Sequence, residues 1–486
     1  MEKASALCAD HIFRFKQAHK ALINLPVTIF AGKGNNGGDG ILTGSYLSSK
    51  YNEQVTIYSM QNPGDMSDEI RRHFFALPPN VKTIFIGKNI PQIDLTQPAL
   101  IVDALLGIGF KGELRGLTKE LITLINSSSN PVISIDVPSG IDIDSGNGKE
   151  AVWADLTLTI GAEKRGLYIS DGRIHSGRVE FLDIGFDLAQ IPDKEVEFEV
   201  ISNATEKLFV RRKEEFYKNK NGRMLIIGGS AIYPGAAVLA ILGANAAGCG
   251  LLTAAIKKRP FAPIPANVIV RDFSENGGEC FNHADHADLE ALAEKQDCII
   301  FGMGASAGND TKDVMNMLLE KDCRLLFDAD ALNTLAMFPD IWQNKKHNNI
   351  VITPHHQEAV RLSQAFNITD FEKMPRLMQA RSLAEKLQCT VLLKGEKSII
   401  ATPGNKPLVN PAGSYALAKG GSGDILSGVI GALLAREKEL SCHKLAAYGA
   451  YLHAAGADYA AQSRTVFDIN ELPQAIKNFI DSQTLF

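Results

Sequence analysis

The residues best suited to do chemistry lie in one short stretch, SYALAKGGSGDILSG at positions 414–428. Its GGSGD pentad, at 420–424, joins a glycine-rich turn to the apolar segment ILSGVIGALLA. Backbone N–H groups at a helix N-terminus bind anions, and glycine lets the backbone approach a phosphate closely. A carboxylate there would repel phosphate unless it has a role, such as taking a proton from a hydroxyl that attacks a phosphoryl group. The alternative is that Asp424 only helps to cap the helix, which leaves the glycines unexplained.

A second glycine-rich segment, AGKGNNGGDG at 31–40, follows a predicted strand and contains a G-x-G-x-x-G pattern. A Rossmann dinucleotide site also requires an acidic residue at the end of the second strand, where VTIYSM instead ends in Met60. Ordinary redox binding of a dinucleotide is therefore disfavoured. The polar residues of this segment, Asn35, Asn36 and Asp39, remain to be explained. One explanation is that they only form the turn, because Asn and Asp favour turn conformations.

Polar residues also end two further predicted strands of the N-terminal half. Asp103 lies in IVDALLG, and Asp136 in IDVPSG precedes Ser139 by three positions. The carboxyl ends of parallel strands form a ligand crevice, so Asn36, Asp103 and Ser139 are expected to meet there. Their oxygens suit a hard cation better than zinc.

Alternating strands and helices must position these residues, a pattern typical of parallel α/β sheets. The apolar run at 236–256 is interpreted as a buried helix plus a turn, not a membrane span. VLLKGEKSIIATP, at 391–403, predicts a β-hairpin. The other predicted strands are 27–30, 55–58, 84–86, 100–103, 132–136, 156–160, 224–227, 299–301, 325–328 and 350–353.

Length, charge and cysteine usage limit the class of protein. The 486 residues exceed what one core usually holds, so two domains are expected, with a boundary near 205 and a charged connection at 206–221. A net charge of −5 without blocks of like charge argues against nucleic acid or an anionic membrane as a partner. The 7 scattered cysteines favour reduced thiols in a cytosolic protein. The first residues show no apolar core of a secretory signal.

The pentad resembles the phosphate-binding turn and catalytic aspartate of the ribokinase-like fold. MLIIGGS at 224–230, YPGA at 233–236, FDADAL at 327–332, ITPHHQE at 352–358 and VLLKG at 391–395 resemble, in that order, the ADP- or ATP-dependent NAD(P)H-hydrate dehydratase family. The N-terminal motifs resemble the NAD(P)H-hydrate epimerase domain that is usually fused to it. The resemblance implies a Rossmann-like three-layer α/β domain at 1–205 and a ribokinase-like α/β domain at 206–486.

This resemblance implies repair of hydrated nicotinamide cofactors. The N-terminal domain would interconvert the R and S forms of NADHX and NADPHX, and the C-terminal domain would dehydrate the S form with ADP and Mg²⁺. Asp424 would be the base, and phosphate would then leave the ring. The rival is a ribokinase-like kinase for a vitamin or sugar alcohol with an N-terminal binding module, whose phosphorylated product would persist. A cytoplasmic homo-oligomer acting on small molecules is expected. Family members usually have more helical residues ahead of the position of Met1, which help to enclose the site or form a dimer.

In the N-terminal domain the resemblance assigns potassium-ligand positions to Asn36, Asp103 and Ser139, and a catalytic role to Asp136. Lys164, in GAEKRG, follows the family pattern, with a surface lysine at a strand end as the alternative. The implied substrate-binding positions are Asn35, Asn36, Gly37, Gly38, Asp39, Gly107, Ile108, Gly109, Phe110, Lys111, Gly112, Glu113 and Asp136.

In the C-terminal domain Met303 replaces the proline of a family G-P-G turn, and Gln357 replaces a glycine of P-H-P-G-E. Glu358 is expected to interact with a helix dipole or to support a residue that contacts the substrate. Asp328 and Asp330 could act through a metal-bound water or be structural. The implied substrate-binding positions are Ala236, Gly304, His355 and Asp424, although a lone histidine is more often structural.

The implied nucleotide-binding positions form two groups, one in the hairpin turn and one in the glycine turn. The alternative for the first group is a plain hairpin with an exposed lysine. The positions are Lys394, Gly395, Glu396, Lys397, Ser398, Gly421, Ser422 and Gly423.

Overall fold

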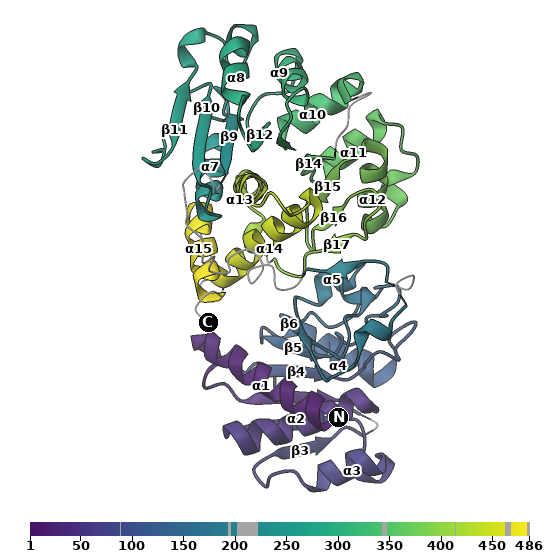
Figure 1. Ribbon diagram of the computed structural model, residues 1–486. Coiled ribbons are helices and arrows are strands. Elements are labelled where there is room, and N and C mark those ends of the chain that lie inside the picture. Colours follow the sequence, from purple (N-terminus) through teal and green to yellow (C-terminus); the bar gives the residue numbers. More distant parts are fainter. Residues whose placement is uncertain are drawn as a thin grey trace. The chain divides into compact units, whose positions relative to one another are not determined.

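The computed structural model describes residues 1–87, 89–192, 196–201, 222–342, 348–413, 415–461 and 468–483. The chain divides into two compact α/β units, Met1–Glu195 and Val196–Phe486 (Figure 1). The second unit starts before the expected boundary at 205, because β8 (Glu199–Val200) pairs with β17 (Leu408–Val409). The charged connection expected at 206–221 lies outside the described residues.

The first unit is built on a parallel sheet with the strand order β3-β2-β1-β4-β5-β6-β7. The central strands β1, β4 and β5 are buried along their whole length, as expected for a parallel sheet covered on both faces. The strands are β1 (Val27–Ala31), β2 (Val55–Ser59), β3 (Lys82–Phe85), β4 (Leu100–Ala104), β5 (Val132–Ile135), β6 (Leu156–Ile160) and β7 (Arg178–Leu182).

Two hydrophobic clusters cover the two faces of this sheet. One contains Ile12 and Ile41 from α1 and α2, packed with Ile29 of β1. The other contains Leu121 from α4, packed with Phe30 of β1. The expected three-layer arrangement is therefore confirmed. The helices are α1 (Glu2–Ala18), α2 (Asn35–Tyr51), α3 (Asp68–Phe75), α4 (Gly116–Ser127) and α5 (Gly172–His175).

The second unit contains a ten-stranded sheet with the order β11-β10-β9-β12-β13-β14-β15-β16-β17-β8. The pairs from β11 to β15 are parallel, whereas β15 and β16 form the antiparallel hairpin that the sequence predicts. The remaining strands are β9 (Arg223–Gly228), β10 (Leu251–Ile256), β11 (Ile269–Asp272), β12 (Cys298–Phe301), β13 (Arg324–Phe327), β14 (Ile350–Ile352), β15 (Thr390–Leu393) and β16 (Ile399–Ala401).

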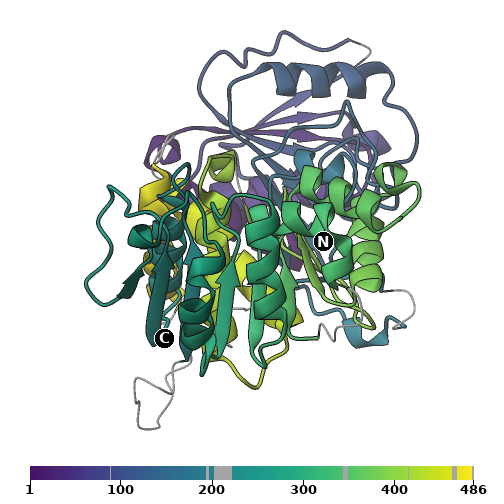
Figure 2. The same ribbon diagram turned by 90° about the horizontal axis from the view of Figure 1, so that it is seen from above.

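Helices lie on both faces of this second sheet (Figure 2). Helix α13 is buried along most of its length and packs closely on α7. A Cβ on Gly428 would lie only 1.9 Å from the Ala240 carbonyl oxygen, so glycine is needed at this contact. None of the helices in the described ranges is both long and apolar enough for a membrane crossing. The helices are α7 (Ala236–Ala246), α8 (His286–Ala293), α9 (Asn309–Leu319), α10 (Asp330–Met337), α11 (His356–Ala365), α12 (Arg376–Leu387), α13 (Ser422–Arg436), α14 (Cys442–Ala461) and α15 (Leu472–Gln483).

The interpretation of residues 236–256 as a helix plus a turn is wrong for its second half. Helix α7 ends at Ala246, Gly248 takes a left-handed φ of 79°, and the chain continues as β10 beside β9. Continuous apolar sequence does not distinguish a buried helix from a buried parallel strand.

Candidate active sites

Asp424 stands in the first turn of α13, directly behind the glycine turn. Gly421, which precedes the helix, has a φ of 88°, a left-handed conformation that glycine adopts without strain. Burial raises the pKa of Asp424 to about 7, and the negative charge of Asp328 adds to the effect. A carboxyl group with that pKa is suited to accept a proton near neutral pH.

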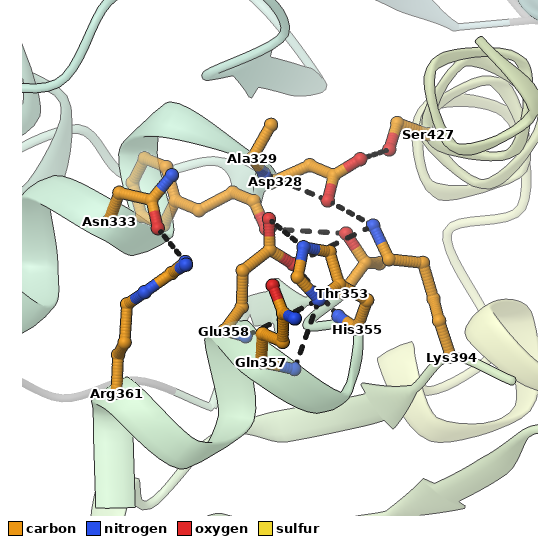
Figure 3. Close-up of polar contacts among 11 residues, drawn as sticks. Asp328, Ala329, Asn333, Thr353, His355, Gln357, Glu358, Arg361, Lys394 and Ser427 are labelled. Atoms are coloured by element: carbon orange, nitrogen blue, oxygen red, sulfur yellow. Dashed lines mark hydrogen bonds and ion pairs between the residues drawn. The ribbon is translucent and has the colours of Figure 1, made fainter. Parts of the chain in front are cut away.

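Three neighbouring strands supply a cluster of polar groups, of which Asp328 and Lys394 act electrostatically on Asp424. Asp328 follows β13, His355 follows β14 and Lys394 follows β15, and these strands are adjacent in the sheet. Their carboxyl ends therefore bring together residues that are far apart in the sequence. Figure 3 shows these side chains converging beside α13.

Asp328 is a buried carboxyl group that makes three polar contacts. Lys394 Nζ lies 2.6 Å from Oδ1, and Ser427 of α13 donates a hydrogen bond to Oδ2 at 2.8 Å. The Ala329 N–H also donates to Oδ1 at 2.9 Å. A Cβ on Gly423 would lie 3.4 Å from Lys394 Nζ, so the ion pair abuts the glycine turn. Lys394 is thus placed beside the N-terminal end of α13, where Asp328 holds its ammonium group.

His355 and Glu358 cap the start of α11 in a reciprocal capping box. The Nδ1 atom of His355 accepts hydrogen bonds from the N–H groups of Gln357 and Glu358, at 3.1 and 3.4 Å. Glu358 Oε2 in turn accepts from the His355 N–H at 2.8 Å. Because Nδ1 accepts, the proton of the neutral ring sits on Nε2, which lies 3.3 Å from Glu358 Oε1. Gln357 is accommodated as an exposed residue of this first turn.

Burial sets the protonation of both partners in this capping box. It lowers the pKa of His355, with the charge of Lys394 acting in the same direction, and both effects favour the neutral ring. Burial also raises the pKa of Glu358 to about 7, against the opposing charge of Lys394. The lone pair of His355 is occupied by the helix N-terminus, so this ring can donate a hydrogen bond but is not free to act as a base.

A cavity of about 590 Å³ opens beside this cluster, a volume suited to a nucleotide-sized ligand. His355 lines it, as do two groups of the expected nucleotide-binding residues. Gly421 and Asp424 are not among the lining residues. The groups are the hairpin turn, Lys394, Gly395, Glu396, Lys397 and Ser398, and the helix start, Ser422 and Gly423.

Ala236 and Gly304 lie together but apart from the lining of this cavity. A Cβ on Gly304 would approach Tyr233 Cβ to 2.7 Å and Ala236 Cβ to 3.1 Å, so Gly304 packs on the start of α7. Met303 is fully buried, and its carbonyl oxygen accepts a hydrogen bond from the Gly229 N–H at 3.0 Å. Methionine in place of proline therefore packs in the core, and its main chain connects the loop after β12 to the loop after β9 by this hydrogen bond.

Sequence reasoning missed His453, a buried residue of α14 that lines the same cavity. Its Nε2 lies 3.0 Å from the Ser422 carbonyl oxygen and 3.3 Å from Ser422 Oγ. Burial lowers the pKa of His453 to about 4, so the ring is neutral and its Nε2–H holds the first residue of α13. The signal in the sequence is a single polar residue in the apolar stretch YLHAAGA.

The first unit has its own cavity, of about 780 Å³, at the carboxyl ends of β1 and β4. Most of the expected substrate-binding residues line it, whereas Gly38, Gly112 and Glu113 do not. A Cβ on Gly38 would lie 2.8 Å from Ile70 Cγ1, so this glycine serves the packing of α2 on α3. The lining includes Asn35, Asn36, Gly37, Asp39, Gly107, Ile108, Gly109, Phe110, Lys111 and Asp136.

Asn36 and Ser139 meet at the main chain of Leu106, and Ser139 links Asp103 to this pair. Its carbonyl oxygen accepts a hydrogen bond from Asn36 Nδ2 at 2.7 Å, and its N–H donates to Ser139 Oγ at 2.8 Å. Ser139 Oγ also donates to Asp103 Oδ1 at 2.5 Å, and Ser134 Oγ donates to Oδ2 at 2.8 Å. Burial raises the pKa of Asp103, although the Ser139 and Ser134 hydrogen bonds oppose this. Asn36 Oδ1 is buried without a partner among the described residues.

Asp136 directly follows β5 and has a left-handed φ of 68°, which is strained for a residue other than glycine. Its Oδ1 accepts hydrogen bonds from Lys164 Nζ at 2.5 Å and from the Ile160 N–H at 3.0 Å. Lys164 also donates to the Ile160 carbonyl oxygen, so it is not a free surface lysine. Burial raises the pKa of nearby Asp39 to about 6.

Two family models together match most of the chain. Residues 224–480 match the NAD(P)H-hydrate dehydratase model, and residues 1–166 match the model described as YjeF-related protein N-terminus. The dehydratase match alone spans more than half of the chain.

Similar proteins span nearly the whole chain. A bifunctional NAD(P)H-hydrate repair enzyme from Moorella thermoacetica is 32% identical over 478 residues, covering 96% of this chain and 88% of that protein. One from Escherichia coli is 30% identical over 441 residues, covering 89% and 80%. A solved ribokinase-like superfamily protein from Enterococcus faecalis aligns with a TM-score of 0.50 at 25% identity, covering 58% of this chain and 95% of its own.

Proposed function

Because the chain belongs to the family of bifunctional NAD(P)H-hydrate repair enzymes, we propose that it interconverts the R and S hydrates of NADH and NADPH and dehydrates the S form with ADP. One observation carries the dehydratase assignment. Asp424, with a pKa of about 7, stands at a helix N-terminus beside the Lys394–Asp328 ion pair, and the preceding Gly423 lines a nucleotide-sized cavity.

In the proposed dehydration, Asp424 takes the proton of the ring hydroxyl, and the hydroxyl oxygen attacks the terminal phosphorus of ADP. The new O–P bond forms as the bond to AMP breaks. The ring C–O bond then breaks, and phosphate leaves with its electron pair. Loss of a ring proton restores the dihydronicotinamide. Phosphate is a far better leaving group than hydroxide. The N–H groups of the glycine turn and the Lys394 ammonium would compensate the charge on the transferred group.

Magnesium fits this site as the companion of the ADP phosphates. Mg²⁺ usually keeps several waters and takes one or two carboxylates besides phosphate oxygens. Among the residues that the structure describes, no cluster of three acidic, histidine or cysteine side chains could hold a metal alone. Asp328 and Asp330 would therefore act on the ion through bound water. The ion would neutralise phosphate charge.

For the first unit we propose a potassium site and a separate proton-transfer group. The unpartnered Asn36 Oδ1 supports a cation there, because a buried amide oxygen without a donor gains a partner when an ion binds. Asp103 and Ser139 would complete its oxygen ligands. Asp136, held by Lys164 and lining the cavity, would contact the hydrated ring and move its proton.

The test is to incubate the pure protein with mixed R and S hydrates, with and without ADP and potassium, and to follow the absorbance of NADPH. Complete conversion to NADPH is expected only when ADP is present. A hydrate that is phosphorylated but never eliminates phosphate would instead identify a small-molecule kinase. No consumption of either hydrate would contradict the proposed function.

A further inference from the structure

A second groove in the C-terminal unit is not used by the mechanism above. It has a volume of about 510 Å³ and is lined by Ala307, Asn333, Met337, Arg361 and Gln364, among others. Figure 3 shows Arg361 and Asn333 on the side of His355 and Glu358 that faces away from Lys394. Two residues of the groove therefore lie on the opposite side of the His355–Glu358 capping box from Lys394, which lines the nucleotide cavity.

Two lining residues of this groove follow expected substrate contacts closely in the chain. Ala307 lies three residues after Gly304, and Arg361 lies six residues after His355 along α11. At 1.5 Å per residue, six helical residues span about 9 Å. A ligand whose reacting ring sits beside His355 would therefore bring a group about 9 Å farther along α11 to the level of Arg361.

Arg361 brings positive charge to an acidic centre. Asp328, Glu358 and Asp424 outnumber Lys394 there, and their field opposes the approach of phosphate groups. The Arg361 guanidinium is exposed, and the one hydrogen bond that its side chain makes within the described ranges is from Nη1 to Asn333 Oδ1, at 2.8 Å. Asn333 thereby fixes the guanidinium while other N–H groups stay available for a ligand.

We propose that this groove binds the pyrophosphate of the hydrated dinucleotide, with Arg361 as its main donor. This inference rests on the proposed dehydratase function. In a nicotinamide dinucleotide the pyrophosphate is one ribose away from the ring, and a guanidinium binds phosphate oxygens through two parallel hydrogen bonds. The exposed Met337 and the neighbouring alanines offer apolar contact for the ribose.

The test compares Arg361→Gln and Arg361→Lys with Lys373→Gln, which removes an exposed charge elsewhere in the same unit. Arg361→Gln should raise KM for the S hydrates of NADH and NADPH by about tenfold or more, the effect of one lost charge-assisted hydrogen bond. Arg361→Lys should recover part of the loss. Lys373→Gln should behave as wild type, and ADP affinity should be unchanged in all three variants.

A truncated substrate separates binding from an indirect effect on Glu358, whose pKa the Arg361 charge also lowers. The hydrate of reduced nicotinamide riboside has no phosphate, so wild type and Arg361→Gln should process it equally. An equal loss with this substrate would overturn the inference, and so would an unchanged KM for the dinucleotides. A loss confined to the NADPH hydrate would place the 2′-phosphate in the groove instead. If wild type dehydrates no hydrate at all, the proposed function fails first.

Discussion

Asp424 is a carboxyl group whose surroundings prepare it for proton transfer. Its replacement in Asp424→Asn keeps the shape and removes the base, so nucleotide-dependent dehydration should fall by about 10³–10⁴, the upper part of the range for a general base. ADP affinity and melting temperature should stay close to wild type. Retention of more than about a tenth of the wild-type rate would rule out the role.

The pKa of Asp424 also predicts the pH dependence of the rate. Burial raises this pKa from 3.8 to about 7, and only the ionised carboxylate can accept a proton. The value of kcat/KM should therefore rise with pH up to about 7 and fall about tenfold for each pH unit below it. Glu358 has a similar pKa, so Glu358→Gln is the control and should keep the midpoint near 7. A midpoint that disappears in this variant would assign the titration to Glu358.

At this scale the sequence reveals residues whose pattern is local and misses those defined by their neighbours. Asp424 and its glycines are contiguous, so the pentad alone suggests an anion site. His453 acts through Ser422, which is 31 positions away in the chain, and nothing near it in the sequence points to that contact. The unpartnered Asn36 Oδ1 is likewise visible only once Leu106 has taken the amide nitrogen.

At the scale of elements, the start of α13 lies between the Lys394–Asp328 ion pair, at the carboxyl ends of the strands, and the nucleotide cavity. A single methyl group at position 423 would reach Lys394 Nζ at 3.4 Å, an ordinary contact, whereas the branches of valine would extend into the ion pair or the cavity. Gly423→Val should weaken ADP binding by about tenfold or more, and Gly423→Ala should change it little. Calorimetric titration with ADP measures both. Equal affinity of the two variants would contradict phosphate binding at this turn.

The strands that position the sites could be predicted because each is an apolar run that ends in a functional residue. The predictions for β1, β4 and β13 meet the observed strands within a residue or two. Strands β7 and β11 are not predicted, because they are edge strands with little hydrophobic pattern: β11 is exposed along its whole length, and β7 is buried only at Leu182. Strand β10 is not predicted because it continues the apolar run of α7, and the sequence does not show where the helix ends and the strand begins.

At the scale of the whole molecule, two units with separate cavities are proposed to act in sequence on one damaged cofactor. The epimerase unit would convert the R hydrate to the S form, which the dehydratase unit consumes. Such coupling needs only a shared pool of substrate, because each site has its own cavity and its own charged groups. Assembly as a homo-oligomer stays a prediction.

This division of labour predicts that defects in the first unit stop repair halfway. Asp103→Asn removes the charge proposed to hold potassium, and Asp136→Asn removes the proposed proton-transfer group. Asparagine is the suitable replacement at position 136 because it tolerates the left-handed φ of 68°. With mixed hydrates and ADP, both variants should consume the S form at the wild-type rate and then stall, whereas wild type should consume everything.

Potassium separates the two roles within that experiment. Excess potassium should partly restore Asp103→Asn, because mass action compensates a weakened ion site, but it should leave Asp136→Asn unchanged. Spontaneous epimerisation, measured without protein, sets the background rate. Variants that run to completion at the wild-type rate would show that these residues are not the epimerase site. If Asp136→Asn responded to potassium as strongly as Asp103→Asn, the ion would have to be bound through Asp136, contrary to the geometry around Leu106.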